Sequence, residues 1–344
     1  MIRIGVICPS EIALRRFMPA LKSTTEFEYV GIAVCTVEER FGEKTLDVPL
    51  GVRKSVLKAE HDKAASFVEV YGGKVFDGYQ TIATSDEIDA LYIPLPPSLH
   101  YKWAKIALAS GKHVLIEKPS TTDVATSVEL AILAEEKGLA LHENYMFAFH
   151  DQLIAINELV ESGEIGGIRV YRLSFGFPRR AANDFRYNKD LGGGALMDAG
   201  GYTIKYGSML LGKTARIAYA QLNYIDEFEV DIYGSAVMVN DKGTTVQISF
   251  GMDNDYKCEL EVWGSKGSLT AGRVFTAPVG FVPQMSIRKE NTDEVRKLPA
   301  DDTFEKSILR FQECIKNKDV RKENYQVLVK QATLIDEFLR MARK

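Results

Sequence analysis

The stretch GVICPSEIALRRFMPAL, residues 5–21, has the form of a buried β-strand that runs directly into an α-helix. An apolar run followed by helical spacing from Ile12 onward is typical of the first βα unit of a dinucleotide-binding fold. In that fold the strand is followed by the fingerprint G-x-G-x-x-G. Here the three fingerprint positions are Cys8, Ser10 and Ala13, so the rest of the chain has to decide whether this turn binds a cofactor.

Each fingerprint glycine has a physical task. The first allows the tight turn, the second lets the backbone approach a pyrophosphate, and the third lets helix and strand pack closely. Ser10 and Ala13 are small enough for the second and third tasks, whereas Cys8 departs from the pattern. Ser10 is placed to cap the helix, whose free N–H groups attract phosphate. An ordinary βα turn with a serine cap is the alternative interpretation.

The first 145 residues alternate between apolar runs and segments with helical periodicity. The runs are IRIGVIC, YVGIAVC, ALYIPL, HVLIEK and LALHE, and helical spacing appears at 12–21, 64–71, 100–108 and 124–136. Apolar runs separated by helices predict buried parallel strands in βαβ units. We therefore expect a doubly wound, Rossmann-like α/β domain over residues 1–145, interrupted by a long connection at 41–58.

From residue 146 the pattern changes to a second domain, 146–344. After a helix at 152–161, apolar and polar residues alternate with period two in the runs IRVYRLSFGF, RIAYAQLNYI, DIYGSAVMVN, TTVQISFGM, CELEVWGS and SLTAGRVF. Such alternation predicts an α+β domain with a large open, mainly antiparallel sheet that has one covered face. Helices are expected at 303–315 and 325–343, and the final segment, 325–344, can pack back on the first domain.

Composition and charge narrow the class of protein. The 344 residues are 46% hydrophobic and 26% charged, with a formal net charge of −4, which disfavours nucleic acid or an anionic membrane as the main partner. The four cysteines form no C-x-x-C and no Cys/His cluster, so we expect neither a disulfide scaffold nor a metal site. With no apolar run long enough to span a bilayer, a cytoplasmic protein is expected.

Two motifs carry candidate chemistry. In IEKPS, Lys118 ends the run HVLIEK, where a strand end meets the ligand crevice and a lysine can donate to a substrate oxygen. In DLGGGALMDAGGY, residues 190–202, three glycines precede a helix start with Asp198 and Tyr202 at i and i+4. A carboxylate and a phenol on one face suit acid/base work on a hydroxyl. A surface ion pair at Glu117 and Lys118, and a core tyrosine at Tyr202, are the structural alternatives.

The combination of YIPLPPSLH, GKHVLIEKP, LGGGALMDAGGY and GSKGSL, in this order along nearly the whole chain, resembles the Gfo/Idh/MocA oxidoreductase family. The resemblance implies a Rossmann domain followed by an open-sheet domain, and NAD(P)-dependent oxidation or reduction, commonly of sugars. It also implies that Ser10 and Ala13 are tolerated variants of the fingerprint. Tyr202 falls where many members have histidine and some sugar-acting members have tyrosine.

The resemblance assigns roles to individual residues. It implies that Lys118, Tyr202 and Asp198 are the catalytic residues. Glu143 and His150 match a segment near the nicotinamide and the substrate. The implied substrate contacts are Lys118, Arg186, Asp198, Tyr202 and Phe149. The expected cofactor contacts, from the βα turn, the end of the second strand and the resemblance, are Cys8, Ser10, Glu11, Ile12, Thr36, Arg40, Pro94, Leu95, His100, Glu117 and Lys118.

The end of the second strand bears on the choice of cofactor. An acidic residue there binds the adenosine ribose of NAD, but this strand ends in Cys35-Thr36. Arg40 or Lys44 can pair with a 2′-phosphate, which favours NADP over NAD. Glu38 and Glu39 are the opposing observation, although such a pair usually lies on a solvated helix face.

We therefore predict hydride transfer between the nicotinamide and a ring carbon of a sugar or nucleotide-linked sugar, with Tyr202 as general acid/base and Lys118 stabilising its phenolate. An NADP-dependent dehydrogenase of dihydrodiol or xylose type, acting on a free small substrate, is one alternative. A non-catalytic NADP(H)-binding sensor is the other. By analogy with the family, a homodimer or homotetramer through the sheet of the second domain is expected.

Overall fold

A computed structural model describes residues 1–42, 46–290 and 292–342. By its internal contacts the chain divides into two compact units. The first comprises residues 1–121, 125–144 and 307–329, and the second comprises residues 122–124, 145–306 and 330–344. The first unit thus takes in residues 307–329, which were predicted to lie in the second domain, whereas the end of the chain from residue 330 belongs to the second unit.

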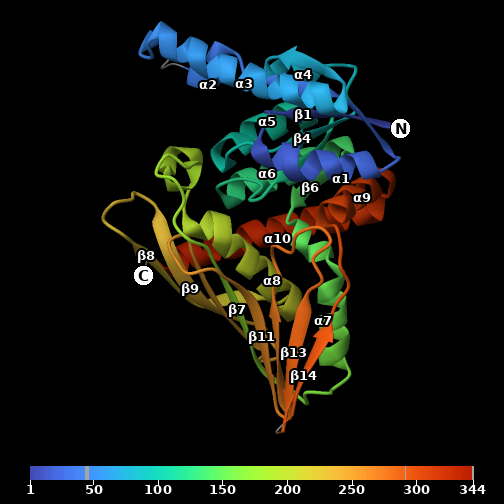
Figure 1. The fold of residues 1–344 in the computed structure, drawn as a ribbon, viewed down its shortest axis with the longest axis vertical. Helices are drawn as coiled ribbons and strands as arrows, with labels where there is room; N and C mark the ends of the chain where they lie inside the picture. The colour runs from blue at the N-terminus through green and yellow to red at the C-terminus, as the bar shows by residue number, and fades with distance from the viewer. Residues whose placement is uncertain (43–45, 291, 343–344) are drawn as a thin grey trace. The chain divides into compact units, whose positions relative to one another are not determined.

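The first unit is a parallel sheet of six strands in the order β3-β2-β1-β4-β5-β6, the doubly wound arrangement expected from the sequence (Figure 1). The strands are β1 (Ile2–Ile7), β2 (Phe27–Val34), β3 (Lys74–Asp77), β4 (Ala90–Ile93), β5 (His113–Glu117) and β6 (Leu141–Asn144). The helices are α1 (Met18–Ser23), α2 (Val37–Phe41), α3 (Leu50–Tyr71), α4 (Tyr79–Thr84), α5 (Pro97–Ala109), α6 (Val124–Lys137) and α9 (Thr303–Lys316).

Helices cover both faces of this sheet because its strands are apolar on both sides. Leu91 and Ile93 of β4 belong to a buried cluster with residues of α4, α5 and α6. Tyr92, which lies between them and therefore points to the opposite face, stacks on Phe17 with ring centroids 3.8 Å apart. The central strands of the sheet are thereby covered on both faces.

Two features of the first unit differ from expectation. The predicted connection at 41–58 is wrong in its second half, because residues from Leu50 onward form the 22-residue helix α3. The length of this helix was underestimated because α3 lacks a clear apolar stripe. Its buried residues are Ala64 and Phe67, both in its second half. Strand β3 was also missed, since its four residues expose all but Phe76.

The second unit is built on a sheet of eight strands in the order β14-β13-β12-β11-β7-β10-β9-β8, in which only the pair β7 and β10 is parallel. The strands are β7 (Ile168–Gly176), β8 (Arg216–Tyr224), β9 (Asp231–Val239), β10 (Thr245–Gly251), β11 (Lys257–Gly264), β12 (Gly267–Gly272), β13 (Gln284–Lys289) and β14 (Thr292–Lys297). The helices of this part are α7 (Asp151–Glu161) and α8 (Gly201–Leu211). Helix α10 (Lys318–Ala342) has its first half in the first unit and its second half in the second.

One face of the eight-stranded sheet is covered and the other is open. Along β9 and β10 buried and exposed residues alternate, and the buried set includes Met238, Val246 and Phe250. Helix α8 packs on this buried side, where Gly207 lies against the Met238 side chain. The predicted large, open, mainly antiparallel sheet is therefore confirmed. Strands β13 and β14 were not predicted, because the exposed, charged β14 lacks an apolar face.

Candidate functional site

The turn after β1 keeps the geometry of a dinucleotide fingerprint although its glycines are absent. Cys8 adopts φ 77°, the left-handed conformation that usually requires glycine. Ser10 accepts a hydrogen bond through Oγ from the Ala13 N–H at 3.2 Å, and Ala13 is fully buried. The turn, the serine cap and the close helix packing are thus all present, so this strand-to-helix turn fits the pyrophosphate of a dinucleotide.

The helix that follows the turn begins with a π-helical turn, Ala13–Phe17, before α1. π-turns are rare and are often found at functional sites. Of the other predicted contacts from this turn, Glu11 is exposed and Ile12 is half-buried. Both therefore remain accessible to a ligand.

At the end of β2, the side chains of Thr36 and Arg40 lie on or next to the short helix α2. Thr36 caps this helix by accepting the Glu39 N–H at 3.1 Å, while Arg40 is exposed. Among the described residues the Arg40 side chain has no hydrogen bond or ion pair. Its guanidinium can therefore bind an anion without breaking an interaction that the structure describes. Lys44, the alternative cation, lies outside the described residues.

The interpretation of Glu39 as a solvated residue is wrong. Its carboxylate accepts hydrogen bonds from three backbone N–H groups, those of Thr36, Tyr79 and Gln80, at 2.9, 2.9 and 2.8 Å. Its negative charge is therefore partly balanced by the N-termini of α2 and α4. Glu39 should accordingly repel the 2′-phosphate of NADP less than the sequence suggested. Two of these partners, at residues 79 and 80, lie far from Glu39 in sequence, which explains why the sequence alone did not reveal this role.

A second carboxylate reaches the end of β2 from helix α3. Glu60 accepts from the Cys35 N–H at 3.0 Å, from the Cys35 thiol at 2.9 Å and from the Tyr79 hydroxyl at 2.7 Å. Burial and the Glu60 carboxylate raise the pKa of Cys35, and burial is the main reason that the pKa of Cys8 rises to about 11. These thiols are therefore protonated near neutral pH and act as packing groups. No sequence signal marks Glu60, which lies in a helix with little amphipathic pattern.

At the ends of β4 and β5, His100 joins two loops of the crevice. Its ring nitrogens lie 2.8 Å from the Pro119 carbonyl oxygen and 2.7 Å from that of Leu95. The ring is fully buried, which lowers its pKa to about 4. The neutral ring donates to one carbonyl at a time. Within this structure His100 holds the loop containing Pro94 and Leu95 against the Lys118-Pro119 turn.

Glu117 is held in place by a buried hydrogen-bond network. It accepts from the Tyr92 hydroxyl and from Asn144 Nδ2, each at 2.6 Å, and burial raises its pKa. Asn144 in turn accepts from the Ser307 hydroxyl of α9 at 2.7 Å. The network fixes the backbone at the end of β5 and hence the base of the Lys118 side chain, which is half-buried. Glu117 is therefore not a surface residue, and Asn144 is a functional candidate that the sequence did not reveal.

The second unit brings two of the candidate substrate residues, Arg186 and Asp198, into contact. Arg186 donates from Nε to Asp198 Oδ2 at 2.6 Å and pairs with Asp184 at 3.1 Å. Both carboxylates of these ion pairs are largely buried, with side-chain exposures of 13% for Asp198 and 19% for Asp184. Arg186 and Asp198, which were predicted separately, thus form one ion pair. Asp184 was not predicted as a site residue, although it lies two residues from Arg186.

Tyr202 lies in an aromatic cluster of the second unit. Its ring makes edge contacts with Tyr145 and Phe175 at centroid distances of 5.4 and 5.2 Å, and its hydroxyl points toward Met146 Sδ at 3.9 Å. The segment before it, Leu196–Gly200, is a π-helical turn rather than an α-helix. Tyr202 is buried, with 8% of its surface exposed, so the cluster restricts its ring; in this respect it is also the core tyrosine of the structural alternative. Phe149 is half-buried and His150 is buried after β6.

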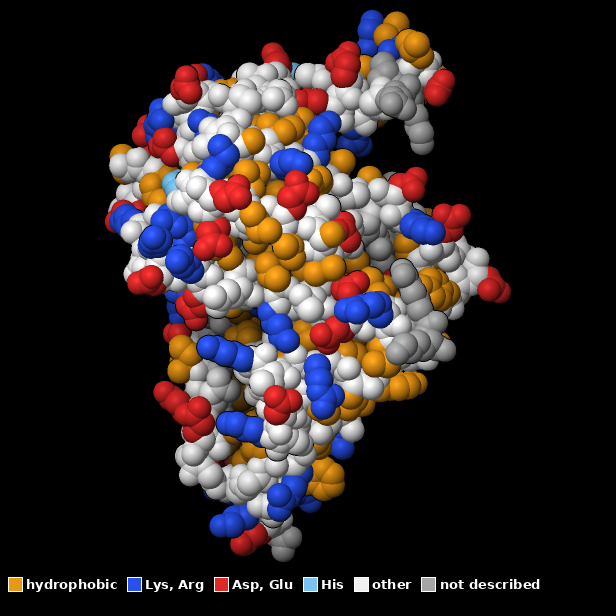
Figure 2. Space-filling view, turned by 180° about the vertical axis from the view of Figure 1, so that it is seen from behind, with side chains coloured by type: hydrophobic (Ala, Val, Ile, Leu, Met, Phe, Trp, Pro, Cys, Tyr) orange, Lys and Arg blue, Asp and Glu red, His pale blue; other side chains and the backbone are white. Residues whose placement is uncertain are grey.

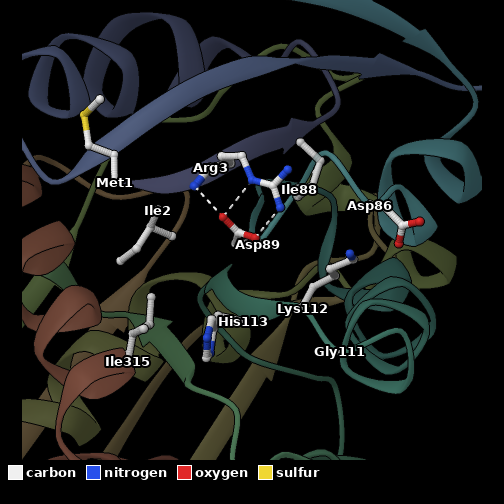
Figure 3. Close-up of a pocket in the computed structure, with 10 residues that line it drawn as sticks. All are labelled: Met1, Ile2, Arg3, Asp86, Ile88, Asp89, Gly111, Lys112, His113 and Ile315. Carbon is white, nitrogen blue, oxygen red and sulfur yellow. Dashed lines mark hydrogen bonds and ion pairs between the residues drawn. The ribbon is translucent and has the colours of Figure 1, made fainter.

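The described residues contain a cavity of about 490 Å³ in the first unit, at the end of the sheet opposite to the predicted site (Figure 3). It is lined by the start of β1 and by residues next to β4 and β5, where Arg3 and Asp89 form an ion pair at 2.6 Å. Ligands in open α/β sheets bind at the carboxyl ends of the strands. This cavity is therefore not the cofactor site.

Surface charge, metal-ligating side chains and helix composition add three observations. On the face drawn in Figure 2, acidic and basic side chains are interspersed. In the described part of the chain there is no group of three or more His, Cys, Asp or Glu side chains placed to hold a metal ion. Nor does any described helix combine the length and apolar character needed to cross a bilayer.

Comparison with known proteins identifies relatives along nearly the whole chain. Residues 41–145 match the oxidoreductase family with an NAD-binding Rossmann fold, and residues 153–270 match the GFO/IDH/MocA C-terminal domain. A dTDP-3,4-didehydro-2,6-dideoxy-alpha-D-glucose 3-reductase from Actinomadura kijaniata is 36% identical over 97% of this chain and 94% of its own length. The enzyme of the same name from Streptomyces violaceoruber is 37% identical over 92% of this chain and 85% of its own length.

A solved structure agrees with these relatives. The 3-ketoreductase of Actinomadura kijaniata in complex with NADP and TDP-benzene has a TM-score of 0.88 and 35% identity, and the match covers 99% of this chain and 97% of that chain. That enzyme has also been solved with a lysine replaced by alanine and with a tyrosine replaced by phenylalanine. Those two positions are separated by the same number of residues as Lys118 and Tyr202.

Proposed function

The chain belongs to the GFO/IDH/MocA family of oxidoreductases, and we propose that it uses NADPH to reduce a keto group on a ring carbon of a nucleotide-linked sugar. The near full-length similarity to sugar-nucleotide 3-reductases carries this proposal. It favours a nucleotide-linked substrate over the free small substrate of a dihydrodiol- or xylose-type dehydrogenase. It also favours reduction as the direction of the reaction.

The residues of the first unit fit a dinucleotide. The left-handed Cys8, the Ser10 cap and the buried Ala13 reproduce what the fingerprint glycines provide. The exposed guanidinium of Arg40, beside Thr36, would pair with the 2′-phosphate, since Glu39 is committed to backbone donors. When bound, the reduced nicotinamide supplies the hydride.

Tyr202 is the proposed acid. Its hydroxyl would donate a proton to the substrate oxygen as the carbonyl is reduced, and Lys118 would hydrogen-bond the same oxygen or the phenol. A lysine ammonium beside a phenol favours the phenolate, so in this proposal Lys118 would help Tyr202 to give its proton to the substrate. The matching separation of a lysine and a tyrosine in the related 3-ketoreductase supports this assignment.

The pair formed by Arg186 and Asp198 is the proposed orienting group for the sugar. Because Arg186 is paired with both Asp198 and Asp184, the three side chains would present a fixed set of donors and acceptors in which one carboxylate charge is left over. Such a pair recognises the hydroxyl groups of a sugar ring by geometry. Phe149 is proposed to contact the substrate next to the nicotinamide.

We further propose that the open face of the eight-stranded sheet joins copies of this chain into a homodimer or homotetramer. This face carries Tyr219, Tyr233 and Trp263, exposed by 55, 45 and 51%. Exposed aromatic residues on a sheet face are typical of interfaces. Light scattering after chromatography should give twice or four times the chain mass for the wild type, and W263E should lower it.

The test of the function is a paired assay. Purified protein is incubated with NADPH and a nucleotide-linked keto sugar, and in parallel with NADP⁺ and either a free pentose or a cyclic diol. Oxidation of NADPH in the first reaction supports the proposal. Turnover confined to the second reaction would favour the dehydrogenase of small substrates, and NADPH binding without turnover in either would favour the sensor.

A further inference from the structure

Asp231, the first residue of β9, reaches the segment that carries Asp198 and Tyr202. Its Oδ2 accepts the Leu196 N–H at 2.6 Å, and the backbone N–H of Ala195 is a further partner. The π-helical turn that begins at Leu196 has no side-chain cap of its own. Asp231 therefore supplies, from a strand of the sheet, the acceptor that the start of this helix lacks.

The three glycines before this segment are explained by the same contacts. Gly192 has φ 76°, and a Cβ on Gly193 would collide with the Arg186 carbonyl oxygen. Gly194 has φ 119°, and a Cβ there would collide with Asp231 Oδ1. The glycines thus allow the chain to pass between the Arg186 backbone and the Asp231 carboxylate, which only residues without a side chain can do.

The contacts connect the candidate substrate residues to the sheet. Strand β9 is paired with β8 and β10, and Asp231 at its start lies opposite Tyr224 of β8, two residues before the first partner of β10, Tyr233. Gly194 donates its N–H to the Arg186 carbonyl at 2.9 Å, and Asp198 donates its N–H to the Gly194 carbonyl at 3.1 Å. Backbone hydrogen bonds therefore tie Arg186 and Asp198 to Gly194, and Asp231 holds the same segment two residues further on, at Leu196.

From this geometry we infer that Asp231 is a positioning residue: it holds residues 195–202 so that Asp198 and Tyr202 meet the substrate in the orientation needed for proton transfer. The inference rests on the proposed function for the identity of the reaction, and on the contacts of the second unit for the anchoring itself. A misplacement of about 1 Å can lower a rate on the order of 100-fold, so the anchor matters for turnover.

The first variants are D231A, which removes the acceptor, and D231N, which keeps one oxygen. D241A serves as the control, because Asp241 is an exposed residue of a turn in the same unit. Hydrogen–deuterium exchange is followed over residues 195–204, and kcat, KM and the NADPH dissociation constant are measured for each protein. These readouts separate local anchoring from catalysis and from cofactor binding.

We expect faster exchange over residues 195–204 in D231A, with the rest of the chain unchanged. We expect kcat to fall on the order of 100-fold while NADPH affinity stays as in the wild type. D231N should lie between the wild type and D231A in both exchange and kcat, because one acceptor oxygen remains. Unchanged exchange in D231A would overturn the inference, and so would faster exchange with an unchanged kcat.

A second pair of variants avoids the loss of the carboxylate. G194A adds a methyl group that collides with Asp231 Oδ1, whereas G243A adds one at φ 81° where nothing lies within 4 Å. Both replacements strain a left-handed glycine, but only G194A disturbs the anchor. Faster local exchange in G194A alone supports the inference, and equal behaviour of the two variants contradicts it. If the wild type reduces no nucleotide-linked sugar, the proposed function fails, while the exchange data still decide whether Asp231 anchors the segment.

Discussion

Replacing Cys8 by glycine and, separately, by alanine tests the backbone conformation on which the cofactor turn depends. Cys8 has φ 77°, and a residue with a Cβ pays roughly 1–2 kcal/mol for this left-handed conformation. Glycine avoids that strain but loses roughly 0.5–1 kcal/mol more backbone entropy on folding than alanine. Both variants lose the same thiol. C8G should therefore be more stable than C8A by roughly 0.5–1 kcal/mol, the reverse of the usual order.

Thermal unfolding followed by circular dichroism measures this difference, which corresponds to about 1–4 °C for a unit of this size. The matched control is Cys314, a fully buried cysteine within α9 of the same unit. In a helix, C314G should be less stable than C314A by about 1 kcal/mol. C8G should also retain NADPH binding, because it keeps the turn. If C8A were as stable as C8G, the left-handed assignment at Cys8 would be refuted.

The remaining predictions concern chemistry, cofactor choice and pH. Y202F should lower kcat on the order of 100- to 10,000-fold with unchanged NADPH affinity, measured by fluorescence energy transfer from tryptophan; a change of affinity alone would contradict the acid role. R40Q should weaken NADPH binding roughly 10- to 100-fold and leave NADH binding unchanged, since a charged hydrogen bond contributes about 1.5–3 kcal/mol; equal loss for both cofactors would contradict 2′-phosphate recognition. Burial raises the pKa of Asp231 to about 6 from an ordinary 3.8, so between these values the folded state binds a proton that the unfolded state releases, and this group makes the fold more stable as pH falls. The melting temperature of the wild type should therefore rise relative to that of D231N when the pH is lowered from 7 to 5, and a constant difference would contradict the raised pKa.

The doubly wound parallel sheet, the mainly antiparallel second sheet and the βα turn could be predicted because each depends on local patterns. Apolar runs such as HVLIEK mark buried parallel strands whatever surrounds them, and period-two alternation marks the second sheet. Elements without such patterns, namely the polar helix α3 and the exposed strands β3 and β14, were missed or underestimated.

The candidate site was predicted where a motif is continuous in sequence. Lys118, Asp198 and Tyr202 lie in such motifs. The residues that hold them, Asn144 and Asp231, are distant in sequence and act through single hydrogen bonds, which leave no local pattern. Their role becomes visible only when the chain is folded, because a carboxylate in a strand carries no information about which backbone N–H it will meet.

The dinucleotide fingerprint could be predicted from the sequence only in part. Its sequence departs from glycine at all three positions, yet the backbone at Cys8 adopts the conformation that glycine usually provides. A sequence pattern reports which residue makes a conformation easy, and the surrounding strand and helix can impose the same conformation on another residue at an energetic cost.

The central claim is that this chain reduces a nucleotide-linked keto sugar with NADPH. The most direct measurement follows the loss of NADPH absorbance when wild-type protein, Y202F and K118A are each mixed with a dTDP-linked 3-keto sugar. We expect rapid oxidation of NADPH by the wild type and a strongly reduced rate for both variants, each of which still binds NADPH. An absence of turnover in the wild type despite bound NADPH, or full activity of Y202F, would contradict it.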